Sequence, residues 1–307
     1  MEGHYSHGLN RVDMYLKDIR TGVCAVEGEP VVEKESAATS LVDGNNLLGP
    51  VVGNFCMDLA IRKAKEVGVG WVVAHGSNHF GFAGYYSMQA LKENMIMSET
   101  SLAPVCHLPT RGKERTLGTS PLSVAAPAEH GARFVPDTSA VALGKVRAGL
   151  SADPIPDGWG CDPEGHVTTD PKSVLTGGGL VPIGGSEATE ELYKVQRQNG
   201  FKTTRKNVSE STKSFISCFS EKASLYNLFV LHNLSRFGFQ GQFFVAINLE
   251  NFAPGFTERM SALLSISRGQ DPADPGSPVL APGDPERLNM KKCEETGGRP
   301  YHINVVK

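Results

Sequence analysis

The sequence lacks the patterns by which several common protein classes are recognised. Its six cysteines are scattered with no Cys-x-x-Cys spacing, so we expect no metal site and no dithiol motif. No apolar run approaches the roughly 20 residues that cross a bilayer, and residues 1–4 do not begin a secretory signal. A formal net charge of −3 gives no general attraction to nucleic acid or to an anionic membrane. We therefore expect a cytoplasmic protein with reduced thiols that binds neither nucleic acid nor a membrane.

Two catalytic signatures are also missing. No Gly-x-Gly-x-x-Gly follows a predicted strand, so a nicotinamide cofactor would have to bind otherwise than in a Rossmann fold. No Gly-x-Ser-x-Gly is present, which argues against a hydrolase with a nucleophile elbow.

Hydrophobic periodicity predicts alternating helices and strands, and so an α/β fold. A chain of 307 residues is long enough for about two domains of ordinary size. The predicted helices are 9–19, 51–67, a segment through Tyr86 and Leu91, 139–146 and 260–267. The predicted strands are 71–74, 122–126, 133–135 and 242–249.

Three segments show no clear period. Residues 150–187 are rich in Gly, Pro and Asp, which is typical of a functional or covering loop. Residues 188–236 are polar and basic, and the tail from Asp271 is rich in Pro and Gly. We expect the tail to be an extended covering segment.

His7 and Arg11 are four residues apart in the first predicted helix, so their side chains would share one face. Reduction of a 2-keto acid needs a proton donor at the carbonyl oxygen, and histidine commonly provides it near neutral pH. It also needs a group that holds the carboxylate, which the arginine fork does bidentately. By spacing alone, a solvated helix face near the terminus is the more common explanation of such a pair.

A second candidate site is the run from Ser77 to Gly81, which contains Asn78 and His79. It follows a predicted buried strand and precedes a helix, where ligands often bind in α/β sheets. The alternative is that Asn78 and His79 only satisfy backbone groups of a tight loop.

Two further runs of small or polar residues are candidates for cofactor contacts. Thr119 and Ser120 precede the strand at 122–126, where small residues let backbone amides approach a phosphate. Asp137, Thr138 and Ser139 precede a predicted short helix and would contact a ribose or a phosphate. An ordinary turn and a helix N-cap are the alternatives for these runs.

Taken together, these stretches resemble the malate/L-lactate dehydrogenase family, which includes ureidoglycolate, sulfolactate and diketogulonate oxidoreductases. The matches run in family order from residue 3 to about 187 and resume from about 241 to 287. The stretches that carry the resemblance are Tyr5 to Arg11, Ser77 to Gly81, Pro109 to Glu114, Leu117 to Leu122, Ile155 to Trp159, Thr168 to Pro171, Pro182 to Gly185 and Pro282 to Glu286.

The resemblance implies a mixed-sheet, non-Rossmann nicotinamide-binding domain, with a second α/β domain formed by the N- and C-terminal parts. It implies a catalytic and dimerisation part at 1–74, a nicotinamide-binding domain at 75–255 and a covering segment at 256–307. It further implies a homodimer that uses NAD or NADP to interconvert a small 2-hydroxy acid, such as malate or lactate, and its 2-keto acid.

The resemblance also assigns roles to individual residues. His7 would be the proton donor, and Arg11 would hold the substrate carboxylate. His79 and Asn78 would face the substrate, with His79 also at the nicotinamide. The expected cofactor contacts are Ser77, Thr119, Ser120, Asp137, Thr138, Ser139, Gly283, Asp284 and Glu286.

The chain departs from the family pattern in three places. Relatives carry a helical stretch ahead of the His-Gly motif, and a longer Asp-Met-Ala-Thr-Ser run where this chain has Asp137 to Ser139. They also carry a long apolar helix where residues 195–236 do not match. Losing a buried helix removes core area at roughly 25 cal/mol per Å². These departures support an alternative, a degenerate relative that keeps a nucleotide-binding or dimer surface without turnover.

Overall fold

The computed structural model describes residues 11–101, 113, 122–131, 133–134, 154–155, 157–181, 240–273 and 275–298. The chain forms two compact units, one from residues 1–102, 121–139 and 238–307 and the other from residues 103–120 and 140–237. The three-part division expected from the sequence stays a prediction, and its first boundary, residue 74, lies inside a strand of the first unit. No helix among the described residues is long and apolar enough to cross a membrane.

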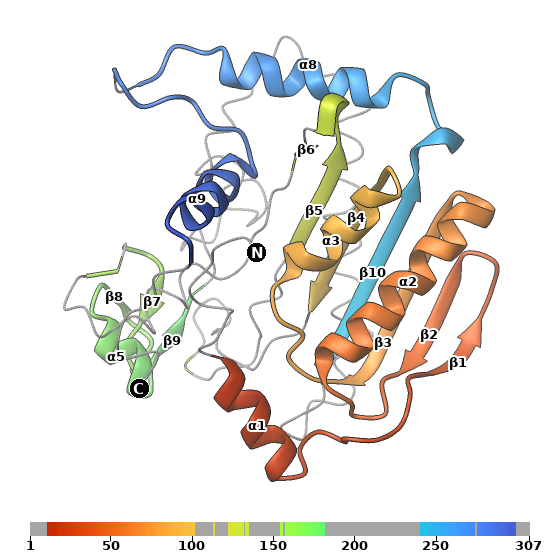
Figure 1. Cartoon of the computed structure of the whole chain (residues 1–307). Coiled ribbons are helices and arrows are strands. Elements are labelled where there is room, and N and C mark those ends of the chain that lie inside the picture. The colour runs from red at the N-terminus through yellow and green to blue at the C-terminus, as the bar shows by residue number, and fades with distance from the viewer. Residues whose placement is uncertain are drawn as a thin grey trace. The chain divides into compact units, whose positions relative to one another are not determined.

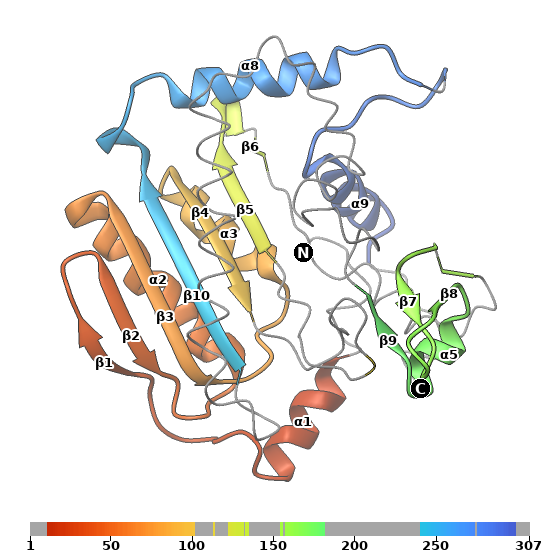
Figure 2. The same cartoon turned by 180° about the vertical axis from the view of Figure 1, so that it is seen from behind.

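The first unit is built on a mixed sheet of seven strands (Figure 1). The spatial order is β1-β2-β3-β10-β4-β5-β6, in which β2 and β3 run parallel and the other neighbours run antiparallel. β10, from late in the chain, lies between β3 and β4, as the reverse view also shows (Figure 2). The strands are β1 (Val31–Glu35), β2 (Thr39–Asp43), β3 (Val69–Ser77), β4 (Met95–Ser101), β5 (Leu122–Pro127), β6 (Arg133–Phe134) and β10 (Gln240–Asn248). The expected α/β class and mixed sheet are confirmed.

Helix α2 (Gly49–Val67) packs along β3 and supplies much of the core. Pro50 lies in its first turn, where proline is pre-organised for a helix, and Gly68 ends it with φ +89°. A Cβ on Gly70 of β3 would lie 1.9 Å from the Ala60 carbonyl oxygen, so only glycine permits this approach of helix to strand. The helix expected over 51–67 is therefore confirmed.

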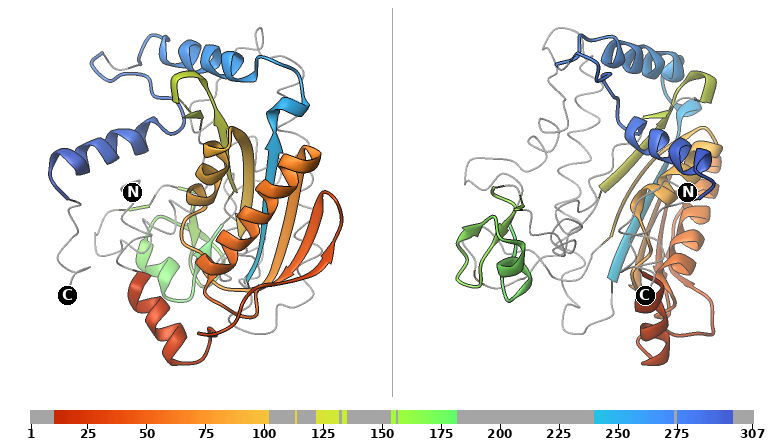
Figure 3. Two further views of the ribbon diagram at one scale, coloured as in Figure 1. Left: turned by 45° about the vertical axis from the view of Figure 1, so that its right-hand side comes forward. Right: turned by 60° about the vertical axis from the view of Figure 1, so that its left-hand side comes forward.

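Helix α3 (Ala83–Lys92) lies beside α2, and both helices cover the same face of the sheet (Figure 3). Tyr86 is fully buried, stacks on Phe80 with ring centroids 4.8 Å apart, and donates a 2.6 Å hydrogen bond to the Phe80 carbonyl. A Cβ on Gly53 of α2 would lie 2.7 Å from the Tyr86 ring. Tyr86 therefore holds the loop before α3 through Phe80 and packs closely against α2 at Gly53.

The C-terminal part of the first unit corrects one expectation. The predicted helix over 260–267 is present as α8 (Phe256–Arg268). However, the tail contains a second helix, α9 (Asp284–Glu295), where an extended segment was expected. The prolines before residue 283 obscured this helix in the sequence. Pro285 lies in the first turn of α9, where the backbone N–H that proline lacks has no partner within the helix. Acidic Asp284 and Glu286 at its start and Lys292 at its end suit the helix dipole.

Short 3₁₀ segments complete the first unit. η3 (Glu129–Gly131) follows β5, and η5 (Leu249–Asn251) follows β10. The Glu129 amide donates to Ser261 Oγ of α8 at 2.8 Å, which ties the end of β5 to that helix.

The described part of the second unit is a small three-stranded sheet with a helix. The strand order is β8-β7-β9, and Ile155, Val174 and Leu180 form its core. Its elements are β7 (Gly160–Cys161), β8 (Val167–Thr168), α5 (Pro171–Leu175) and β9 (Gly179–Leu180). The expectation of an irregular loop over 150–187 is wrong for residues 157–181, because strands of two residues are too short to show a period. The expected helix at 139–146 and the atypical segment 188–236 lie outside the described residues.

Candidate active site

The loop from Asn78 to Phe82 connects the end of β3 to α3, and the Asn78 side chain holds it in place. Asn78 Nδ2 donates to the Leu47 carbonyl and to Asn46 Oδ1, each at 3.1 Å. Its own carbonyl accepts a 2.9 Å hydrogen bond from Gln242 of β10. Asn78 therefore satisfies backbone groups, as the structural alternative expected, and at the same time fixes the position of His79.

The turn after β2 fits closely against the end of β3. The Asn46 amide donates to the Gly76 carbonyl at 2.7 Å, and Asn46 has φ +54°, a left-handed conformation that asparagine tolerates. A Cβ on Gly49 would lie 2.3 Å from the Asn78 carbonyl oxygen. No pattern in the sequence indicates that Asn46 supports the His79 loop.

Helix α1 (Val12–Arg20) supplies a third part of the site. Tyr15 Oη and His79 Nδ1 are 2.8 Å apart, and the two rings are tilted with centroids 5.7 Å apart. Burial raises the pKa of Tyr15 to about 12, against the opposing effect of the Arg11 charge. Arg11 is the residue immediately before α1 and lies four positions before Tyr15. Arg11, Tyr15 and His79 therefore belong to one site.

Tyr15 was missed by the sequence reasoning. Its only sequence signal is the spacing of four residues after Arg11, which repeats the spacing from His7 to Arg11. A tyrosine at one more helical position is far more often a packing residue, so the spacing alone does not identify it.

The structure brings together Arg11, Ser77, Asn78 and His79 of the expected site. Ser77 is the last residue of β3, directly before Asn78. The other expected residues near the N-terminus and around β5 lie outside the described residues: His7, Thr119, Ser120, Asp137, Thr138 and Ser139.

Two features at the end of β3 fit the approach of a bound group. Ser77 Oγ is buried and has no hydrogen-bond partner among the described residues. Gly81 has φ +97°, and no atom of the described residues lies within 4 Å of the place that a Cβ would occupy. An unsatisfied hydroxyl and an open backbone position suit contact with a polar ligand such as a nicotinamide.

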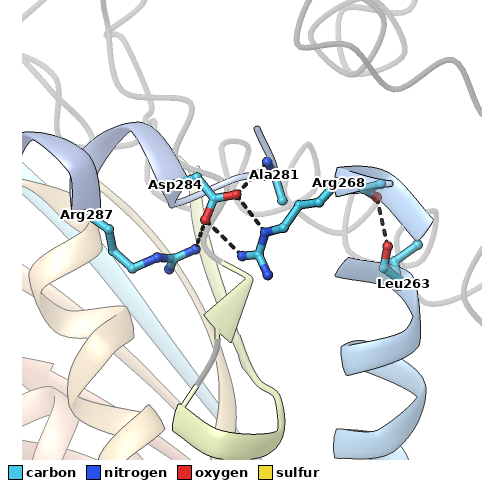
Figure 4. A network of polar contacts seen from close by, with 6 residues as sticks. Leu263, Arg268, Ala281, Asp284 and Arg287 are labelled. Atoms are coloured by element: carbon cyan, nitrogen blue, oxygen red, sulfur yellow. Dashed lines mark hydrogen bonds and ion pairs between the residues drawn. The ribbon is translucent and has the colours of Figure 1, made fainter. Parts of the chain in front are cut away.

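Asp284, one of the expected cofactor residues of the tail, has a structural role. Asp284 accepts hydrogen bonds from Arg268 Nε at 2.9 Å, Arg268 Nη2 at 2.8 Å and the Ala281 amide at 2.8 Å (Figure 4). Arg287 also contacts this carboxylate. Gly283, with φ +91°, begins α9, and Glu286 is exposed in its first turn. Asp284 thus joins α8 to α9.

One group of acidic and histidine side chains lies at another place, on β1, β2 and β3. His75 Nε2 is 2.8 Å from Glu33, and its Nδ1 is 3.8 Å from Asp43. The potential ligand atoms lie within 4.8 Å of one another. His75 turns different ring nitrogens to the two carboxylates, which is the geometry of an ion-pair cluster across three strands.

Comparison with known proteins places these features in a family. A family model described as "Malate/L-lactate dehydrogenase" matches residues 1–195. The chain is 34% identical over 300 residues to the malate/(S)-sulfolactate dehydrogenase of Methanothermus fervidus, covering 97% of this chain and 82% of that protein. It is 29% identical over 273 residues to the (2R)-3-sulfolactate dehydrogenase (NADP(+)) of Chromohalobacter salexigens, covering 88% and 77%.

A solved structure is similar over nearly the whole chain. The sulfolactate dehydrogenase of Methanocaldococcus jannaschii superposes with a TM-score of 0.76 at 30% identity, covering 99% of this chain and 83% of that one.

Proposed function

Because the chain belongs to the malate/L-lactate dehydrogenase family, it is an NAD(P)-dependent oxidoreductase of small 2-hydroxy acids, and we propose that Arg11, Tyr15 and His79 form part of its active site. The observation that carries this proposal is the hydrogen bond between Tyr15 and His79, which joins the helix after Arg11 to the loop after β3. These two segments are the ones in which the family resemblance places the substrate.

The proposed reaction divides the work among four side chains. His7 gives a proton to the carbonyl oxygen in reduction and takes it back in oxidation. Arg11 holds the substrate carboxylate through two parallel hydrogen bonds. His79 and Asn78 face the reacting end of the substrate, and Asn78 keeps the loop in place.

NAD(P), when bound, supplies the exchange of hydride with the substrate carbon. The residues that we propose to hold it are Ser77, Thr119, Ser120, Asp137, Thr138, Ser139, Gly283, Asp284 and Glu286. Among the described residues the Ser77 hydroxyl has no hydrogen-bond partner and the position beside Gly81 is open, which supports this placement at the end of β3.

The proposed substrates are malate, sulfolactate and lactate. The first two are the substrates named for the relatives, and each carries a second anionic group besides the carboxylate. Lactate lacks that group, so comparing it with malate tests whether the site recognises one anion or two. We also propose that the protein is a cytoplasmic homodimer. Size-exclusion chromatography with light scattering measures its molar mass and so tests the dimer.

The test follows the decrease in absorbance of NADH or NADPH after purified protein is mixed with oxaloacetate, sulfopyruvate or pyruvate in turn. We expect oxidation by the parent and its loss in His7→Ala. Exposed Lys17→Ala on α1 is the matched control and should keep the parental rate. Folded parent protein that oxidises neither cofactor with any of these acids would overturn the proposal and favour the degenerate relative. A rise in melting temperature with NADH would then show that the nucleotide surface remains.

A further inference from the structure

Asn46 joins three segments around the proposed site through both its backbone and its side chain. Its side-chain Nδ2 donates to the Val23 carbonyl, and its backbone carbonyl accepts a 2.8 Å hydrogen bond from the Ala25 amide. Its Oδ1 accepts from Asn78 Nδ2 at 3.1 Å, and its amide donates to the Gly76 carbonyl at 2.7 Å. One residue thus binds the segment after α1, the end of β3 and the loop before α3.

Helix α1 depends on such contacts, because none of its residues is fully buried. The turn that follows it is tight, since the Val23 and Cys24 amides donate to the Asp18 carbonyl at 2.9 and 3.1 Å. The segment that Asn46 holds is therefore tied to the last turn of α1. An element with few buried apolar contacts moves easily when a polar contact is lost.

The partner on the other side of Asn46 is held more firmly. Asn78 also donates to the Leu47 carbonyl at 3.1 Å, and its own carbonyl accepts from the Gln242 side chain at 2.9 Å. Losing the Asn46 side chain should therefore displace the helix more than the loop.

We propose that Asn46 is a positioning residue of the reaction. By holding the segment after α1 against the loop that carries His79, it sets the distance between His79 and Arg11, the residue before α1. This inference rests on the proposed function, because Arg11 and His79 take their roles from it. A small substrate that is held at both ends tolerates little error, and a misplacement of about 1 Å can lower the rate about 100-fold.

The backbone of this turn offers a matched pair of variants. Asn45 and Asn46 have φ of +49° and +54°, a region that glycine adopts without strain. Asn46→Gly therefore removes the side chain and permits the same turn. Asn45→Gly is the control, because the Asn45 side chain is exposed and donates to the Glu29 carbonyl at 2.6 Å, away from α1.

The structural test is hydrogen–deuterium exchange with mass spectrometry of the peptide that covers residues 12–25. We expect its amides to exchange about tenfold faster in Asn46→Gly than in the parent, and within about twofold of the parent in Asn45→Gly. Equal exchange in the two variants would overturn the inference. This readout needs no turnover, whereas an inactive parent protein would overturn the proposed function instead.

The kinetic test separates positioning from a loss of folded protein. Partial unfolding lowers kcat and leaves KM unchanged, since the remaining folded enzyme binds normally. A displaced Arg11 weakens the hold on the substrate carboxylate, so KM for the 2-keto acid should rise about tenfold in Asn46→Gly. KM for the reduced nicotinamide, and both KM values of Asn45→Gly, should stay within about twofold of the parent. An unchanged KM for the 2-keto acid in Asn46→Gly, or an equal rise for the cofactor, would contradict the positioning role.

Asn46→Asp tests the side of the link that faces α1. Aspartate also tolerates positive φ, and its carboxylate can still accept from Asn78, but it presents an oxygen to the Val23 carbonyl in place of a donor. We expect KM for the 2-keto acid to rise at least as much as in Asn46→Gly. A parental KM in Asn46→Asp would show that the hydrogen bond to Val23 does not place α1.

Discussion

Asp284 and Arg268 form a bidentate ion pair that connects two helices which are 16 residues apart in sequence. Both carboxylate oxygens are used, and only 13% of the Asp284 side chain is exposed. Burial alone would raise the pKa of Asp284, but the hydrogen bonds from Arg268, the Ala281 amide and Arg287 outweigh it and lower the pKa to about 2. This pair therefore contributes to stability as long as the carboxylate is charged.

Asp284→Asn should lower the free energy of unfolding by about 2 kcal/mol at neutral pH. The folded pKa lies below the unfolded one, so the contribution is present above pH 4 and is lost as the pH falls toward 2. Urea unfolding of parent and variant at a series of pH values measures this difference. Glu286→Gln, exposed on the same helix, should cost less than about 1 kcal/mol. A difference between parent and Asp284→Asn that stayed constant down to pH 2 would contradict the prediction.

Gly70→Ala should destabilise the first unit strongly. The new methyl would lie 1.9 Å from the Ala60 carbonyl oxygen, so α2 and β3 must move apart. Overpacking of this kind costs about 1–3 kcal/mol or more. Gly298→Ala, at a position where no described atom lies within 4 Å of the new Cβ, should leave the melting temperature unchanged. Similar melting temperatures for the two variants would show that helix and strand are not in close contact.

Asn78→Asp should lower the free energy of unfolding more than Asn54→Asp, which is the same chemical change on α2. The new oxygen would face the Leu47 carbonyl and Asn46 in place of a donor, at a cost of about 3 kcal/mol. In Asn54→Asp the new carboxylate can still accept the hydrogen bond from Gln89, so the stability should change by less than 1 kcal/mol. Chemical denaturation of the two variants measures their free energies of unfolding. An equal loss of stability in both variants would argue against the described loop geometry.

Among the cysteines that the structure describes, Cys293 should be alkylated first. Cys24, Cys56 and Cys161 are buried, and burial raises the pKa of Cys56 to about 12, so Cys56 stays a thiol even at pH 9. Iodoacetamide treatment of native protein with peptide mass spectrometry tests this order. Modification of Cys56 before Cys293 would contradict the burial of Cys56 in the core of the first unit.

The sequence by itself determined the secondary elements with strong local signals. The stripe of apolar residues in α2, its Pro50 and its final Gly68 are local features that predict a helix with these ends. The same holds for α3, β5 and most of β10. The family resemblance likewise depends on local runs, and it named Arg11, Ser77, Asn78 and His79, which lie on segments that the structure brings together.

Only the tertiary structure decided how these segments meet. β10 pairs with β3 and β4, more than 130 residues earlier in the chain, through backbone hydrogen bonds that no side-chain pattern reports. The contact of His79 with Tyr15 was hidden for the same reason, since Tyr15 lies 64 residues earlier in the sequence and a tyrosine on a helix is more often a packing residue. Local periodicity depends on neighbours in sequence, whereas the contact between Tyr15 and His79 depends on folding, which brings distant segments together.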